Sequence, residues 1–150
     1  MLTGTHHTSF TVSDLDRSLA FYRDVLGLEV TAEIGGSTPY VSKVVGYPDA
    51  KLRIAFLRLP GTSHRLELIQ YLSPAGDRPP LETKDTGSGH LAFLVDDMLT
   101  VYEALRAKGV RFRSPPVEVT PGDPNTGRAV YFADPDGITL ELIQRPRRSG

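Results

Sequence analysis

An internal repeat limits the fold of this chain more than any other feature of its sequence. Residues 7–14 read HTSFTVSD and residues 90–97 read HLAFLVDD, so a His, a Phe, a Val and an Asp recur at one spacing. Residues 66–70 and 140–144 are the same pentapeptide, LELIQ. An internal duplication explains both recurrences. Because a chain of 150 residues has the size of one ordinary domain, the two copies are expected to share one core.

The first copy has the pattern of a βαβββ module. Residues 7–12 alternate in polarity, as in a half-buried strand, and Ser13 or Asp14 suits the N-cap of a following helix. Apolar residues then recur at helical spacing as far as Gly27, which is typical of a helix C-terminus. A Gly/Ser/Pro-rich stretch and a turn separate the strands expected next. These strands cover residues 28–34, 52–59 and 65–72.

The second copy repeats this order. A strand over residues 90–95 precedes a helix that carries Met98, Val101 and Leu105 on one face. Strands are then expected over residues 110–113, 128–133 and 138–145, and the tetrapeptide DPDG at 134–137 forms the last turn.

We therefore expect one α+β domain, residues 1–150, built from two βαβββ modules. The modules cover about residues 5–73 and 87–146, and a polar connector rich in Pro and Gly covers 74–86.

Composition favours a small-molecule partner. A net charge of -1 and a pI of about 6.4 provide no basic surface for nucleic acid or an anionic membrane. The start of the chain lacks a basic segment followed by an apolar one, and no apolar run is long enough to span a bilayer. We expect a soluble, cytoplasmic protein. Because cysteine is absent, any metal must bind to nitrogen and oxygen ligands.

Each module has one His at the head of its first strand and one Glu in its last. These residues are His7 and Glu67 in the first module, and His90 and Glu141 in the second. If the modules pack about a pseudo-twofold axis, the four side chains converge on one point. Two imidazoles and two carboxylates suit a divalent metal such as Ni²⁺, Co²⁺, Zn²⁺ or Mn²⁺, which would act as a Lewis acid toward a carbonyl oxygen.

Ordinary structural roles are the competing interpretation. A Glu in an alternating strand usually faces solvent, and a strand His is more often packed or exposed than a ligand. The duplication favours the metal site because it retained the polar residues as well as the core ones. His6 and His64 have no repeat partner, and both are interpreted as surface residues.

The motifs at residues 7–12, 14–27, 89–95 and 134–141 resemble those of the vicinal-oxygen-chelate superfamily. This superfamily includes glyoxalase I, methylmalonyl-CoA epimerase, extradiol dioxygenases, fosfomycin-resistance transferases and bleomycin-resistance proteins. The resemblance covers the chain from His7 to Gln144 and implies that the two modules form a paired, cup-shaped open β-barrel.

The resemblance to glyoxalase I also implies a site, since its metal ligands match all four residues named above. It implies one divalent metal ion, Ni, Co, Zn, Mn or Fe, and a lyase or isomerase that transfers a proton alpha to a carbonyl. Glu141 is the expected first base, and Glu67 is its partner on the opposite face. Small family members commonly form homodimers, so a homodimer is expected as well.

Other positions separate this chain from particular family members. Methylmalonyl-CoA epimerases have a catalytic Glu where Ile54 stands, and glyoxalase I has a polar glutathione contact where Tyr71 stands. The fosfomycin enzymes have a substrate-contacting Tyr that matches Tyr131. By the epimerase alignment Ile54 and Phe56 share the wall of the cup, which favours a partly hydrophobic or aromatic ligand.

Two alternatives from other classes remain open. One is a metal-free drug- or metabolite-binding protein of the bleomycin-resistance kind. The other is an extradiol-type dioxygenase with Fe²⁺ on His7, His90 and Glu141, because dioxygenases use two His and one Glu.

Overall fold

The structure, a computed structural model, describes residues 1–77, 79, 82–123 and 125–146. The chain divides into two compact units, Met1–Pro79 and Pro80–Gly150. The connector expected at 74–86 contains residues 78, 80 and 81, which lie outside the described residues. No helix in the described part of the chain is long and apolar enough to cross a membrane.

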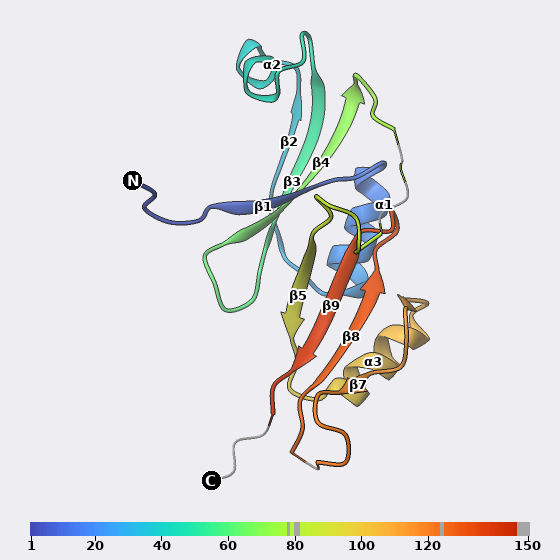
Figure 1. Ribbon diagram of the computed structural model, residues 1–150. Coiled ribbons are helices and arrows are strands. Elements are labelled where there is room, and N and C mark those ends of the chain that lie inside the picture. The colour runs from blue at the N-terminus through green and yellow to red at the C-terminus, as the bar shows by residue number, and fades with distance from the viewer. Residues whose placement is uncertain (78, 80–81, 124, 147–150) are drawn as a thin grey trace. The chain divides into compact units, whose positions relative to one another are not determined.

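The first unit is a four-stranded sheet with three helical segments (Figure 1). The strand order is β1-β4-β3-β2, in which β1 is parallel to β4 and the other neighbours are antiparallel. The elements in chain order are β1 (His7–Thr11), α1 (Leu15–Leu19), the π-helical segment η1 (Ala20–Val25), β2 (Val30–Gly36), α2 (Pro39–Val45), β3 (Lys51–Arg58) and β4 (Arg65–Ser73).

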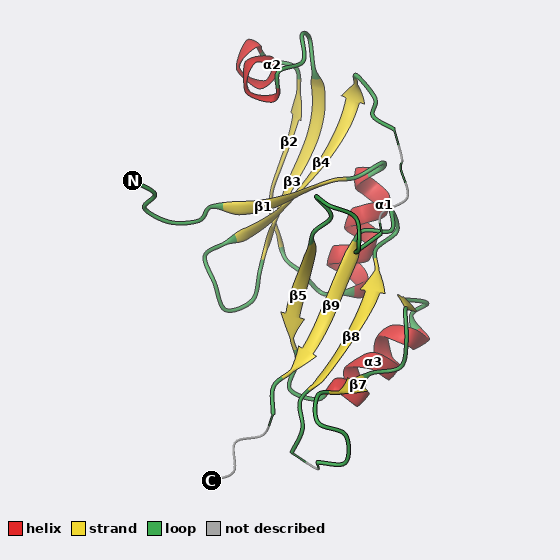
Figure 2. Cartoon of the chain, in the orientation of Figure 1, coloured by secondary structure: helices red, strands yellow, loops and turns green. Residues whose placement is uncertain are grey.

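The second unit repeats this topology with order β5-β9-β8-β6, and β7 also pairs with β8. Its first and last strands, β5 and β9, are parallel, as β1 and β4 are. Figure 2 shows α3 beside the β8–β9 pair, and α3 contacts β9. The elements are β5 (His90–Leu94), α3 (Met98–Ala107), β6 (Arg111–Phe112), β7 (Val117–Glu118), β8 (Arg128–Ala133) and β9 (Thr139–Gln144). The expected α+β fold of two βαβββ modules is confirmed.

One helix, α2, occupies the Gly/Ser/Pro-rich stretch for which no element was expected. Local chemistry defines its ends, because the Thr38 hydroxyl accepts a hydrogen bond from the Val41 N–H and Pro39 lies in the first turn. Gly46 ends the helix with a φ of 77°. None of its residues is buried, so the apolar periodicity that reveals most helices is absent here.

The repeated pentapeptide LELIQ has two structural roles, one on each face of its strand. Its Leu residues are buried against the helix side, whereas its Glu faces the opposite side. Its Gln bonds the start of the module's helix: Gln70 accepts from the Leu15 N–H at 3.1 Å, and Gln144 accepts from the Met98 N–H at 2.7 Å.

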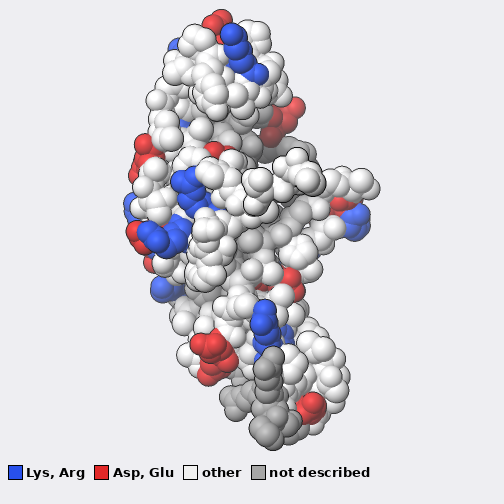
Figure 3. Space-filling model, turned by 90° about the vertical axis from the view of Figure 1, so that its left-hand side faces the viewer, with Lys and Arg blue, Asp and Glu red and all other residues white. Residues whose placement is uncertain are grey.

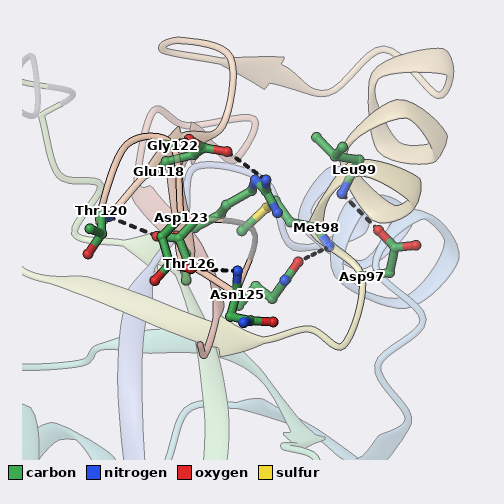
Figure 4. Close-up of polar contacts among 12 residues, drawn as sticks. Asp97, Met98, Leu99, Glu118, Thr120, Gly122, Asp123, Asn125 and Thr126 are labelled. Carbon is green, nitrogen blue, oxygen red and sulfur yellow. Dashed lines mark hydrogen bonds and ion pairs between the residues drawn. The ribbon is translucent and has the colours of Figure 1, made fainter. Parts of the chain in front are cut away.

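The N-cap aspartates complete the bonding of these helix starts. In Figure 4 the carboxylate of Asp97 accepts from the N–H of Leu99. The same carboxylate accepts from the N–H of Thr100 at 3.2 Å. In α1 the carboxylate of Asp14 accepts in the same way from the N–H groups of Asp16 and Arg17. With the Gln bonds, the first three N–H groups of each helix are satisfied, which they could not be within the helix itself.

The DPDG sequence forms the β8–β9 turn as predicted. The buried carboxylate of Asp134 accepts from the N–H groups of Asp136 and Ile138, at 2.9 and 2.8 Å. Gly137 has a φ of 87°, a conformation that favours glycine. This turn starts β9 in the register that sets Glu141 opposite Tyr131.

Charged side chains do not form a single-sign surface on the face that Figure 3 draws. Among the described residues shown there, basic and acidic groups are interspersed in small clusters. This agrees with the net charge of -1.

Candidate metal centre

The first module brings His7 and Glu67 together across two parallel strands. Ser9 is the register partner of Glu67, and His7 lies two residues before Ser9, so both side chains are on one face of the sheet. The His7 Nε2 and Glu67 Oε2 atoms are 3.3 Å apart. The Glu67 side chain is only 9% exposed, whereas that of His7 is 34% exposed.

The second module repeats this pair with His90 and Glu141. Ala92 is the register partner of Glu141, and His90 again lies two residues earlier on the parallel strand. The His90 Nε2 and Glu141 Oε2 atoms are 3.2 Å apart. The duplication has therefore preserved the relative position of the His and the Glu as well as their identity.

The donor atoms of each pair fit a divalent cation. Nitrogen and oxygen ligands lie about 2.0–2.2 Å from such a metal, so two ligands at octahedral or tetrahedral angles are roughly 2.9–3.5 Å apart. Both observed separations fall within this range. A largely buried carboxylate such as Glu67 also needs a hydrogen-bond donor or a cation beside it. Within either module, the described residues gather no group of three or more His, Asp or Glu side chains, so each module supplies a pair.

An aromatic ring lies beside each histidine. Phe56 is the register partner of Glu67, and its ring is 5.8 Å from that of His7. Tyr131 is the register partner of Glu141, and its ring is 5.2 Å from that of His90. Two of the expected substrate-contacting residues are thus equivalent under the repeat, although their strands share no obvious sequence motif.

Ile54 and Tyr71 extend this face of the first module. Ile54 lies two residues before Phe56 on β3 and is half-buried. Tyr71 lies on the Glu67 side of β4, and burial, with smaller contributions from Tyr47 and Glu67, raises the pKa of its hydroxyl. This face of the first module therefore carries apolar and aromatic side chains beside the His–Glu pair. That Ile54 and Phe56 contact a substrate stays a prediction.

Two arginines beside the pairs were not predicted from the sequence. The Arg65 guanidinium lies over the Phe56 ring at 4.5 Å, and that of Arg113 lies 6.0 Å from the Tyr131 ring. Arg113 also donates to the Thr139 hydroxyl at 3.1 Å. Sequence comparison of the two modules could not reveal this similarity, because Arg65 lies on β4 whereas Arg113 follows the end of β6.

His6 was interpreted as a surface residue, and it is exposed, but its ring contacts a predicted metal ligand. The Nδ1 atoms of His6 and His7 are 2.7 Å apart, and Arg65 donates to Nε2 of His6. Adjacent residues of a strand point to opposite faces, so the sequence pattern places these rings apart. Because β1 begins at His7, His6 is free of that alternation.

His64, the other histidine without a counterpart in the repeat, does not contact the His–Glu pair. Its Nε2 is 2.9 Å from the Thr8 hydroxyl, and Thr8 alternates with His7 along β1. Nothing in this contact connects His64 to the candidate metal ligands.

A family model described as the Glyoxalase/Bleomycin resistance protein/Dioxygenase superfamily matches residues 4–142. The chain belongs to this superfamily. Glyoxalase-superfamily relatives usually use a divalent metal, which agrees with the donor sets described above.

Relatives in the glyoxalase superfamily include an epimerase and several lyases. A 2-epi-5-epi-valiolone epimerase from an Actinomyces species is 38% identical over 145 residues, covering 94% of this chain and 79% of the relative. A probable lactoylglutathione lyase from Synechocystis is 30% identical over 140 residues and covers 92% of both chains. These names fit the expected lyase or isomerase class and leave the substrate open.

Solved structures agree on the fold. A glyoxalase family protein from Bacillus cereus superimposes with a TM-score of 0.83, covering 98% of this chain and 97% of the other, at 22% identity. At that identity the likeness concerns the fold alone.

Proposed function

We propose that the protein is a metal-dependent isomerase of the epimerase type. It removes a proton from the carbon next to a carbonyl group of a small substrate and returns a proton to the opposite face of that carbon. The observation that carries this proposal is the pair of equivalent half-sites, His7 with Glu67 and His90 with Glu141. We propose that these four side chains bind one divalent cation, Ni²⁺, Co²⁺, Zn²⁺, Mn²⁺ or Fe²⁺. When bound, the metal polarises the carbonyl oxygen and so acidifies the adjacent C–H bond.

The two carboxylates divide the proton transfer between them in this proposal. Glu141 accepts the proton from one face of the substrate carbon, and Glu67 returns a proton to the opposite face. The C–H bond that breaks and the C–H bond that forms are on the same carbon, so only its configuration changes. Two equivalent carboxylates suit this reaction, because either can act as the base, depending on the direction.

Epimerisation is favoured over lactoylglutathione lysis by two observations. The relative named as an epimerase is 38% identical to this chain, compared with 30% for the lyase from Synechocystis. In addition, the position of the glutathione contact is occupied by Tyr71, whose ring packs 6.0 Å from that of Tyr47. Phe56, Ile54 and Tyr131 then serve as substrate contacts beside the metal ligands.

Metal binding tests the four-ligand proposal. The purified protein is loaded in turn with the five metals, and metal content and thermal stability are measured for the wild type, Glu67→Gln and Glu141→Gln. We expect about one metal per chain, and weaker binding in both variants. Glu103→Gln is the matched control, since Glu103 is an exposed helix residue paired with Arg106. Metal-free protein that still binds ligands would instead indicate a binding protein of the bleomycin-resistance kind.

Proton transfer is tested by solvent exchange. With 2-epi-5-epi-valiolone as the probe, NMR in D₂O should show deuterium entering the carbon next to the carbonyl as its configuration inverts, and each Gln variant should abolish the inversion. Turnover of lactoylglutathione without such exchange would favour the lyase. Oxygen consumption with Fe²⁺ and a catechol, retained in Glu67→Gln, would favour the dioxygenase.

The expected homodimer is a separate proposal. Light scattering of the purified protein should give twice the chain mass of 16.4 kDa. A monomer would leave the metal proposal untouched.

A further inference from the structure

We infer that His6 is a positioning residue, which orients the metal ligand His7 by accepting a hydrogen bond from it. We also infer that the hydrogen bond from Arg65 to His6 opposes metal binding. The inference rests on the proposed metal site, and it concerns a residue outside the four ligands. His6 has no counterpart in the second module, where Gly89 stands at the equivalent position. The inference therefore applies to the half-site of His7 and Glu67 and not to that of His90 and Glu141.

Two hydrogen bonds and one close polar contact link four side chains in a row around His6. Arg65 donates to Nε2 of His6, Nδ1 of His6 lies 2.7 Å from Nδ1 of His7, and Nε2 of His7 lies 3.3 Å from a Glu67 oxygen. The His6 ring also packs edge-on against Phe56, at 6.3 Å between centroids. These contacts fix the position of both imidazole rings.

The chemistry of the donors determines where the protons are in this chain. A guanidinium can only donate, so Nε2 of His6 accepts and the proton of the neutral ring is on its Nδ1. That N–H then donates to Nδ1 of His7, which leaves the His7 proton on Nε2, facing Glu67. In this arrangement Nε2 of His7 has no lone pair to offer a metal.

Metal binding requires the opposite arrangement. When Nε2 of His7 binds a cation, its proton is on Nδ1 and must be donated to an acceptor. Nδ1 of His6 is the group at hydrogen-bond distance, and it accepts only when the His6 proton moves to Nε2. Arg65 must then turn away from His6. Because the Arg65 side chain is long and partly exposed, it can do so without disturbing the core.

Opposite effects of two substitutions follow from this competition. Replacing His6 by Ala removes the acceptor that orients His7, and loss of such an outer partner typically weakens metal binding by about 10–100-fold. His6→Asn should restore most of the affinity, because its side-chain oxygen can accept the same hydrogen bond. Replacing Arg65 by Met removes the competing donor and keeps an apolar contact with Phe56, so it should leave binding equal to or tighter than in the wild type.

Titration calorimetry with Zn²⁺ on the full-length protein tests these effects. His64→Asn is the matched control, because His64 is in the same module and bonds Thr8 rather than His7. Its Zn²⁺ affinity should remain within about twofold of the wild type. The melting temperature of metal-free His6→Ala should change by only about 1–2 °C, as expected for an exposed residue. Ring-nitrogen NMR of the Zn²⁺-bound protein should show the His7 proton on Nδ1.

Other outcomes of the Zn²⁺ titrations would contradict either the inference about His6 or the proposed function. Unchanged or tighter Zn²⁺ binding in His6→Ala, with wild-type protein that binds Zn²⁺, overturns the inference and leaves the proposed function standing. Equal weakening in His6→Ala and Arg65→Met also overturns it, since both substitutions would then act through local packing. Wild-type protein that binds no divalent metal overturns the proposed function, and the inference with it.

Discussion

The repeated glutamines should differ in what they contribute to stability, although they occupy equivalent positions. Gln144 is 7% exposed and accepts the Met98 N–H at 2.7 Å in a buried setting. Gln144→Leu keeps the size of the side chain and leaves this N–H without a partner. A buried unsatisfied donor costs about 1–3 kcal/mol. For a protein of this size, that is a fall of roughly 2–12 °C in melting temperature.

Gln70→Leu should cost less, about 0.5–1.5 kcal/mol, because its bond to the Leu15 N–H is only part-buried and water can replace it. Urea unfolding of both variants measures the difference. Hydrogen exchange of the Met98 amide checks its cause, since protection there should fall in Gln144→Leu and persist in Gln70→Leu. Equal stability losses in the two variants, or unchanged Met98 protection, would show that the Gln144 bond does not secure the start of α3.

Two further predictions concern residues outside the candidate site. Gly127→Ala would bring a Cβ within 2.8 Å of the Gln144 carbonyl oxygen, so we expect a loss of about 1–3 kcal/mol in urea unfolding, whereas Gly76→Ala, which meets open space, should be neutral. A neutral Gly127→Ala would contradict this packing. The hydrogen bond from Arg53 lowers the pKa of Asp16 in the folded protein. This ion pair therefore stabilises the protein above the unfolded-state pKa of about 4, and the stabilisation is lost as the pH falls through the lower folded-state pKa. Asp16→Asn should therefore be slightly less stable than wild type at pH 7, and the difference should shrink as the pH falls below about 4. A difference that does not shrink on acidification would refute the pairing.

Local sequence patterns were sufficient to predict the fold class and the four candidate ligands. Alternating strands, an amphipathic helix and glycine turns are local patterns, and their recurrence at a fixed spacing revealed the duplication. The same recurrence selected His7, Glu67, His90 and Glu141, because polar residues that survive at equivalent positions are unlike ordinary surface residues. The fold prediction is confirmed, and the four-ligand site remains a proposal.

The other side chains around each His–Glu pair could not be predicted from local patterns, because they come together through contacts between elements. Phe56 and Tyr131 are equivalent through strand register. Arg65 reaches the first ring from β4, and Arg113 reaches the second from the segment after β6. The helix α2 was not predicted because it has no buried face, and only its capping residues mark where it begins and ends. His6 escaped because its ring departs from the alternation of the strand that follows it. Local patterns record which way a residue faces within one element, whereas contacts between elements depend on register and on side-chain reach, which no single stretch of sequence contains.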